Sequence, residues 1–172
     1  MSEQLLNQPR KPHSAQVSQS PHNAAPVQPT MKQQWVSFTL GDEKYVLPVH
    51  AVREIMPYLK PTPVPGAPLE AEGVLNVRGE VITVLSGYKL LGLPPTTLGP
   101  DERRIIILEA SDELLGVSVD GVEEIVKFHH SQIEPSEQSI NREFIKGTVY
   151  HQENLFILVD FIKYSEKIAQ HV

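Results

Sequence analysis

The side chains that could do chemistry in this sequence are few, and most stand where a structural role is expected. His129 and His130 are adjacent, so on a strand they point to opposite faces and cannot bind one metal ion together. Ser86 precedes a short helical pattern and has no histidine or aspartate close by in sequence, which favours a helix N-cap over a nucleophile. The chain contains no cysteine, which excludes thiolate chemistry, disulfides and cysteine-bound zinc.

Two acidic pairs, Asp42-Glu43 and Asp112-Glu113, stand where strands are expected to reverse, and such positions are typical of solvated turns. The sequence has no Gly-x-Gly-x-x-Gly motif, no Walker-type phosphate loop and no His-Glu-x-x-His motif. Nucleotide binding and zinc-protease chemistry therefore lack their minimum parts. We predict no catalytic residues, no cofactor and no metal site.

One charged pair is more informative. Glu54 follows a Val-x-x-Val turn, and Arg78 lies at the tip of a predicted hairpin within Asn76–Gly79. A carboxylate and a guanidinium from strands of one unit can pair and fix the surface between them. An exposed ion pair contributes only about 0–1 kcal/mol to stability. The pattern is therefore compatible with a recognition surface or with an ordinary solvated pair.

The elements that position these residues occur twice. Residues Phe38–Met56 align without a gap with Leu108–Val126, and six of the nineteen positions are identical. Further along, Gly73–Lys89 aligns with Gly147–Lys163. Each half reads as two apolar strands around an acidic turn, a short helical turn, a third strand and a hairpin that begins at glycine. Two copies are too few for an open solenoid, so they predict a pseudo-symmetric pair of small β-units.

The remaining elements complete an all-β prediction. The continuous apolar runs Ile105–Leu108 and Leu155–Val159 predict strands that are covered on both faces. Ser86–Leu91 predicts a short helix, and a C-terminal helix is expected after Asp160, with Phe161 and Tyr164 on its apolar face. We therefore expect two small β-barrels with short connecting helices and a C-terminal helix.

Composition limits the partners and the location. The 172-residue chain carries a net charge of −6, which disfavours nucleic acid or an anionic membrane as its main partner. Residues 1–33 are rich in Gln, Pro and Ser, and we expect a disordered tail whose removal hardly changes the melting temperature. No 18-residue apolar run and no signal-peptide pattern are present, so we expect a cytoplasmic protein without membrane insertion.

At these residues the chain resembles the CheW family of chemotaxis coupling proteins. The resemblance runs from Gln34 to about Ile168 and rests on five ordered segments: Phe38–Tyr45, Val52–Ile55, Gly73–Gly79, Val119–Ile125 and Gly147–Asp160. It implies two intertwined, five-stranded SH3-like barrels within residues 34–172, following pseudo-repeats of about 34–102 and 103–172. It also implies a protein without catalytic activity.

The resemblance further implies partners and a site. Family members tie methyl-accepting chemotaxis receptors to a CheA-type histidine kinase, whose regulatory domain is itself CheW-like. Carried over by position, the receptor-binding groove between the barrels includes Val52, Glu54, Gly73, Arg78, Val117, Val119 and Val122. A side chain at Gly73 would stand where backbone approaches closely. We therefore expect Gly73→Asp to weaken receptor binding by roughly 2 kcal/mol or more while folding largely survives.

One segment departs from the family pattern, which usually closes the first half with Asp-Leu-Arg. This chain has Ser86-Gly87-Tyr88 there, whereas Asp160 keeps the equivalent place in the second half. The departure favours a divergent or pathway-specific coupler. Two alternatives remain: a coupler of a non-flagellar pathway, such as twitching motility or surface sensing, and a small-ligand-binding or hydrolytic β-barrel enzyme. A pocket with convergent polar groups and strongly shifted pKa values would favour the enzyme.

Overall fold

The computed structural model describes residues 31–137 and 143–169, all of which belong to one compact unit. Most of the tail expected over residues 1–33 lies outside the described residues, and the first strand already begins at Gln33. The strands are β1 (Gln33–Leu40), β2 (Glu43–Pro48), β3 (Val52–Pro57), β4 (Ala71–Val77), β5 (Glu80–Ser86), β6 (Arg104–Ala110), β7 (Glu113–Val119), β8 (Gly121–Phe128), β9 (Glu134–Pro135), β10 (Ile145–His151) and β11 (Asn154–Val159).

The helices are short and stand at the connections. The two α-helices are α1 (Gly87–Leu90) and α2 (Ile162–Ala169), and the 3₁₀ helices are η1 (Val49–Ala51), η2 (Pro100–Glu102) and η3 (His130–Gln132). The predicted cap of α1 is confirmed, because the backbone N–H of Lys89 donates to Ser86 Oγ at 3.3 Å. Within residues 31–137 and 143–169, no helix is long and apolar enough to cross a membrane.

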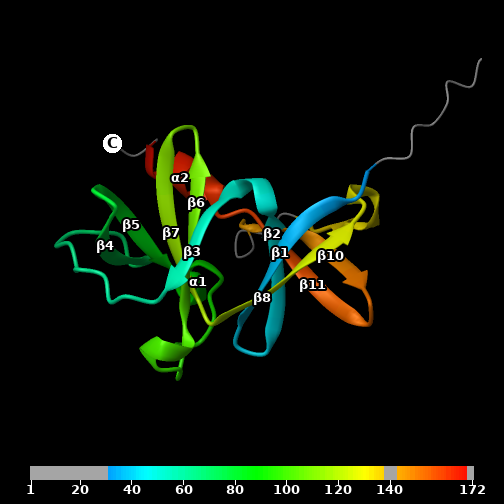
Figure 1. Cartoon of the computed structure of the whole chain (residues 1–172), viewed down its shortest axis with the longest axis horizontal. Helices are drawn as coiled ribbons and strands as arrows, with labels where there is room; N and C mark the ends of the chain where they lie inside the picture. The colour runs from blue at the N-terminus through cyan, green and yellow to red at the C-terminus, as the bar shows by residue number, and fades with distance from the viewer. Residues whose placement is uncertain (1–30, 138–142, 170–172) are drawn as a thin grey trace, which may run out of the picture. The chain divides into compact units, whose positions relative to one another are not determined.

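The strands form two sheets, and each sheet combines strands from both halves of the sequence. The first sheet has the order β8-β1-β2-β11-β10-β9, and the second has the order β3-β6-β7-β5-β4. In Figure 1 the blue β1 and the cyan β2 lie beside the orange β10 and β11, and the green β4 and β5 lie beside β6 and β7. The sequence repeats over 34–102 and 103–172 therefore do not coincide with the two sheets, because the halves exchange strands.

Both sheets are assembled according to one scheme. In each, the first hairpin of one half pairs with the third strand of the other half, as β1 does with β8 and β6 with β3. In each, the second strand of that hairpin also pairs in parallel with the last strand of the other half. These pairs are β2 with β11 and β7 with β5. The short β9 adds a sixth strand to the first sheet, and a single bridge from Thr62 to Val74 takes the equivalent place in the second. The all-β fold of paired SH3-like barrels is confirmed.

The largest apolar cluster lies between the two sheets. It includes Phe38 of β1, Ile106 of β6 and Phe161 before α2, which are 0–2% exposed. Each sheet also has one smaller apolar cluster on its interior face. In the first sheet it lies around Trp35 and Phe128, and in the second around residues 105 and 107. Along β6, successive side chains alternate between the inter-sheet cluster and the interior of the second sheet. This alternation confirms the prediction that the apolar run of β6 is covered on both faces.

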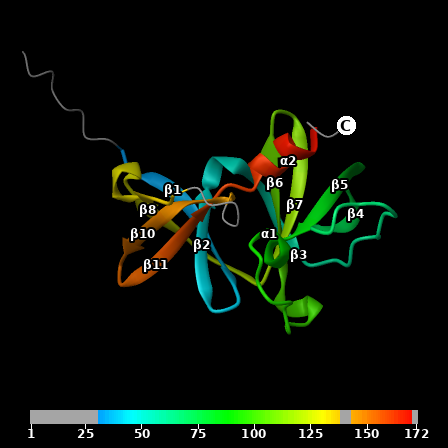
Figure 2. The same cartoon turned by 180° about the vertical axis from the view of Figure 1, so that it is seen from behind.

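The C-terminal helix covers part of the inter-sheet cluster. From behind, α2 is seen in red beside β6 (Figure 2). Phe161 and Tyr164 are buried in the cluster, as their positions on one helical face predict. The hydroxyl of Tyr164 donates to Glu70 Oε2 at 3.1 Å, which ties α2 to the connection between β3 and β4.

Candidate functional site

The predicted pair Glu54 and Arg78 is formed. Arg78 Nη2 donates to Glu54 Oε1 at 2.8 Å, a distance typical of a charge-assisted hydrogen bond. The Arg78 side chain is 78% exposed and that of Glu54 is 30% exposed, so solvent screens the pair and it stabilises the fold by at most about 1 kcal/mol. The two charges are held in a defined position on the surface, where another molecule can reach them.

Two backbone features place this pair. Arg78 and Gly79 have φ values of 54° and 87°, the two left-handed residues that a two-residue hairpin turn requires. Asn76 Oδ1 accepts a hydrogen bond from the N–H of Gly79 at 3.0 Å, which holds the turn. The register of β3 against β6 shifts between Val52 and Glu54, and such a bulge redirects the side chains that follow it.

The ion pair connects elements from opposite ends of the second sheet. Glu54 belongs to β3 at one end of the strand order, and Arg78 follows β4 at the other end. The Thr62 bridge acts at the same junction, since Thr62 and Val74 exchange two backbone hydrogen bonds of 2.9 Å. We call the surface formed by Glu54 and Arg78 the charged rim.

The pseudo-equivalent rim of the first sheet lacks this charge pattern. By the sequence alignment, Glu124 of β8 corresponds to Glu54, and Gln152 of the β10–β11 turn corresponds to Arg78. Glu124 and Gln152 line one shallow hollow, and Gln152 has the same left-handed conformation as its counterpart, with φ 48°. The amide cannot form an ion pair, so the charged pair distinguishes the rim of the second sheet from that of the first.

The four valines of the expected groove fall into two groups. Val52 and Val122, which are equivalent in the repeats, are partly exposed and pack against the inter-sheet cluster from different sheets. Val117 and Val119 are 0% exposed and belong to that cluster. In this conformation they support the surface from beneath, and the expectation that they line a groove for a partner is not supported by their burial.

Gly73 is buried and does not face an open surface. Its φ of 142° is one that L residues rarely adopt, and an added Cβ would overlap the backbone carbonyl of Thr62. Gly147, its counterpart, is opposed in the same way by the carbonyl of Glu134 in β9. The close backbone approach is thus internal to the protein. The expectation that Gly73→Asp leaves folding intact is wrong, because the substituent would displace the Thr62 bridge.

A buried polar cluster around Asp120 was missed by the sequence analysis. The carboxylate oxygen Oδ2 accepts the Tyr88 hydroxyl and the backbone N–H of Gly41, the latter at 2.8 Å. Asp120 is 5% exposed, and burial, followed by the hydrogen bond to Asp120, raises the pKa of Tyr88. A neutral donor, the Tyr88 hydroxyl, therefore satisfies this carboxylate. The difference from the family pattern at Ser86-Gly87-Tyr88 was the sequence signal that could have pointed to this cluster.

The pKa values that are raised belong to packed tyrosines, whereas that of Lys146 is lowered, mainly by neighbouring Lys163. Burial raises the pKa of Tyr45, Tyr58 and Tyr88 above the usual value, and that of Tyr164 to about 12. All four phenols remain protonated at neutral pH and act as hydrogen-bond donors within the fold. In the part of the chain that the structure describes, no group of three or more His, Asp or Glu side chains is placed to hold a metal ion.

The structure is an all-β scaffold of two sheets with an exposed ion pair at the rim of the second sheet. Residues 34–168 match the family model described as the CheW-like domain. The chain belongs to this family, and the protein is a CheW-type coupling or scaffold protein without enzymatic activity.

Relatives and a solved structure agree with this assignment. The chain is 31% identical over 128 residues to chemotaxis protein CheW of Bacillus subtilis, covering 73% of this chain and 81% of the relative. It is 29% identical over 154 residues to Protein PilI of Pseudomonas aeruginosa, covering 85% of this chain and 82% of that protein. The crystal structure of scaffolding protein TtCheW from Thermoanaerobacter tengcongensis superposes with a TM-score of 0.70 at 28% identity, covering 76% of this chain and 90% of that one.

The contact between Gly73 and Thr62 leads to a stability prediction. We expect Gly73→Ala to lower the free energy of unfolding by about 2–4 kcal/mol, because it combines a disfavoured φ with a backbone overlap. Gly66→Ala is the matched control: its φ is +78°, but nothing lies within 4 Å of an added Cβ, so conformational strain alone should cost about 1 kcal/mol. Urea unfolding followed by circular dichroism gives both values, and equal losses would show that the Thr62 contact has no energetic role.

Proposed function

We propose that this protein couples methyl-accepting chemotaxis receptors to a CheA-type histidine kinase in a two-component signalling pathway, as a cytoplasmic adaptor. Membership in the CheW-like family supports the class of function. The observation that carries the proposal is the charged rim, because its ion pair contributes little to stability yet is held by a hairpin turn, a bulge and a bridge. A receptor that offers apolar side chains to Val52 and polar groups to the pair would be bound in a fixed register.

A second pair of surfaces supports contact with the kinase. Ile55 of β3 and Val81 of β5 are 40% and 72% exposed, and their repeat counterparts Ile125 and Leu155 are 55% and 57% exposed. Large exposed apolar side chains at equivalent positions of both sheets give the protein two related apolar faces. A kinase domain that is itself CheW-like presents similar faces, and alternating contacts between such domains extend an assembly. We propose these two faces as the kinase-binding surfaces.

The alternative of a non-flagellar pathway is favoured by one comparison. The relative that matches 85% of this chain is named Protein PilI rather than chemotaxis protein CheW. The departure at Ser86-Gly87-Tyr88 is also a difference from the usual family pattern. A coupler dedicated to twitching motility or surface sensing keeps the same adaptor mechanism and differs in the receptor and output that it serves.

The coupling function is tested by reconstitution. Purified protein added to membranes that carry a candidate receptor and to its CheA-type kinase should make kinase autophosphorylation responsive to the receptor ligand. The protein itself should accept no phosphate, because it acts by bringing the two partners together. Autophosphorylation is measured with labelled ATP after electrophoresis. The proposal would be refuted if kinase autophosphorylation at saturating protein did not respond to receptor ligand with any of the candidate receptors.

The charged rim is tested by charge reversal. Glu54→Arg or Arg78→Glu places like charges together and should weaken receptor binding about tenfold or more, whereas the double reversal should recover part of the loss. Binding is measured by co-sedimentation with receptor-containing membranes. The matched control is Arg53→Glu: Arg53 neighbours Glu54 on the same strand but pairs with Glu109, at 3.1 Å, and not with a residue of the rim. Equal losses for Arg53→Glu and Arg78→Glu would show that binding depends on net charge and not on the rim.

A further inference from the structure

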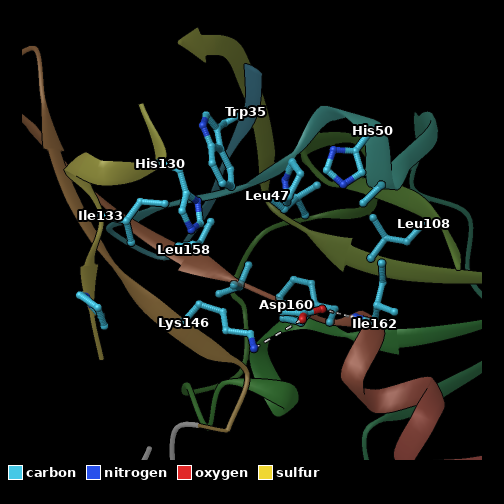
Figure 3. Close-up of a pocket in the computed structure, with 15 residues that line it drawn as sticks. Trp35, Leu47, His50, Leu108, His130, Ile133, Lys146, Leu158, Asp160 and Ile162 are labelled. Atoms are coloured by element: carbon cyan, nitrogen blue, oxygen red, sulfur yellow. Dashed lines mark hydrogen bonds and ion pairs between the residues drawn. The ribbon is translucent and has the colours of Figure 1, made fainter. Parts of the chain in front are cut away.

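A pocket of about 620 Å³ opens beside η1 and the start of α2, within the size range of roughly 300–1,000 Å³ that is usual for small-ligand sites. Figure 3 shows Trp35, Leu47 and Leu158 on one part of its wall and Leu108 and Ile162 on another, with Lys146 and Asp160 between them. Most of the wall is apolar. The pocket contains none of Val52, Glu54 and Arg78, so it is separate from the charged rim.

The repeat explains why this pocket is open. At the equivalent position in the other half, the Tyr88 hydroxyl reaches across to Asp120 and donates a hydrogen bond to it. Tyr88 and Asp120 correspond to Ile162 and His50 in the alignment of the halves, and these two residues line the open pocket. The protein therefore fills the location at Tyr88 and Asp120 with its own side chains, and leaves the equivalent location at Ile162 and His50 open.

A second difference between the halves contributes to the size of the pocket. Gly87 of α1 lies so close to β7 that an added Cβ would be 2.7 Å from the carbonyl oxygen of Ser118. The residue in the equivalent place is Phe161, whose ring is 2% exposed and packs in the inter-sheet cluster. A buried ring here requires more space than a glycine, so α2 cannot approach β2 as closely as α1 approaches β7. The opening is thus a consequence of the sequence at two specific positions.

At one point the pocket wall carries the ion pair of Lys146 and Asp160. Lys146 Nζ lies 3.9 Å from Asp160 Oδ2, longer than a hydrogen bond. Neighbouring Lys163, followed by burial, lowers the pKa of Lys146, and Asp160 and Glu166 oppose this effect without reversing it. Two ammonium groups, Lys146 and Lys163, are therefore close together here, and an anion placed against Lys146 on the side away from Asp160 would reduce their mutual repulsion. His50 and His130 are exposed at the pocket.

Trp35 provides an unused hydrogen-bond donor in the wall. It is 3% exposed and stacks on Phe128 with ring centroids 4.8 Å apart. Among the described residues, its indole Nε1–H is one of the few buried side-chain groups that lack a hydrogen-bond partner. Buried polar groups are normally satisfied, so a wall that combines an unsatisfied donor, apolar side chains and a destabilised ammonium is suited to an occupant.

We propose that this pocket binds a small amphipathic organic anion, a carboxylate with an aliphatic or aromatic body. The body lies against the apolar wall formed by Trp35, Leu47 and Leu158, and the carboxylate is held by Lys146. The ligand is not a substrate, since no bond is made or broken. Binding beside η1 and α2, which both border the inter-sheet cluster, gives a scaffold protein a means to respond to a metabolite independently of the charged rim.

The protein carries its own reporter for the test. Trp35 is the single tryptophan of the chain, so the indole region of a ¹H–¹⁵N spectrum contains one tryptophan signal. Octanoate is the probe, with 1-octanol and octylammonium as neutral and cationic controls of equal chain length. We expect octanoate to shift the indole signal saturably with a Kd below about 1 mM, and the two controls to bind at least tenfold more weakly. Octanoate that causes no saturable shift, or controls that bind equally well, would overturn the proposal.

Variants separate the pocket from non-specific binding. Lys146→Met should weaken octanoate binding about tenfold, and Lys89→Met, on the exposed face of α1 in the other half, should leave it unchanged. The pair His50→Asp and Ile162→Tyr copies Asp120 and Tyr88 and should close the pocket, abolishing the shift. Melting curves by circular dichroism establish that each variant is folded. If the closing pair does not fold, Lys146→Met and Lys89→Met decide the question alone, and equal affinity of these two variants would refute the role of Lys146.

Discussion

The exchange of strands between the two halves is the constraint on which the rest of this structure depends. Neither half can complete a sheet, because β1 and β2 need β8 and β11, and β6 and β7 need β3 and β5. The apolar cluster between the sheets draws on both halves as well, from Phe38 to Tyr164. Burial of each large apolar side chain in such a cluster stabilises the fold by about 1.5–3 kcal/mol. The stability of either sheet is therefore tied to the presence of the other.

Within this shared architecture the two halves differ locally at a few equivalent positions. The halves share hairpin turns, bulges and glycines that are opposed by a carbonyl. They differ where Arg78 replaces an amide at one rim and where Tyr88 fills a location that is open in the other half. Duplication supplies the architecture twice, so one copy of each location can diverge without loss of the fold. The charged rim and the pocket are two such divergences.

Sequence reasoning reached the elements and the ion pair because these depend on local patterns. Glu54 and Arg78 could be paired from a turn and a hairpin tip, and the apolar run of β6 indicated a strand covered on both faces. The burial of Val117 and Val119 and the contact of Gly73 with Thr62 could not be read in this way. They depend on which strands of the two halves become neighbours, and the family resemblance transferred the positions of these residues without their surroundings. The Asp120 cluster was missed for the same reason.

The central claim, that the halves are interdependent, is tested most directly by cutting the chain between Gly99 and Pro100 in the connection before β6. The two purified fragments are compared, separately and mixed, by circular dichroism and by the dispersion of their ¹H–¹⁵N spectra. We predict that neither fragment folds alone, because each sheet then lacks strands, and that an equimolar mixture regains the spectrum and the cooperative unfolding of the intact protein. Native-like dispersion and cooperative unfolding of either isolated fragment would contradict the exchange of strands.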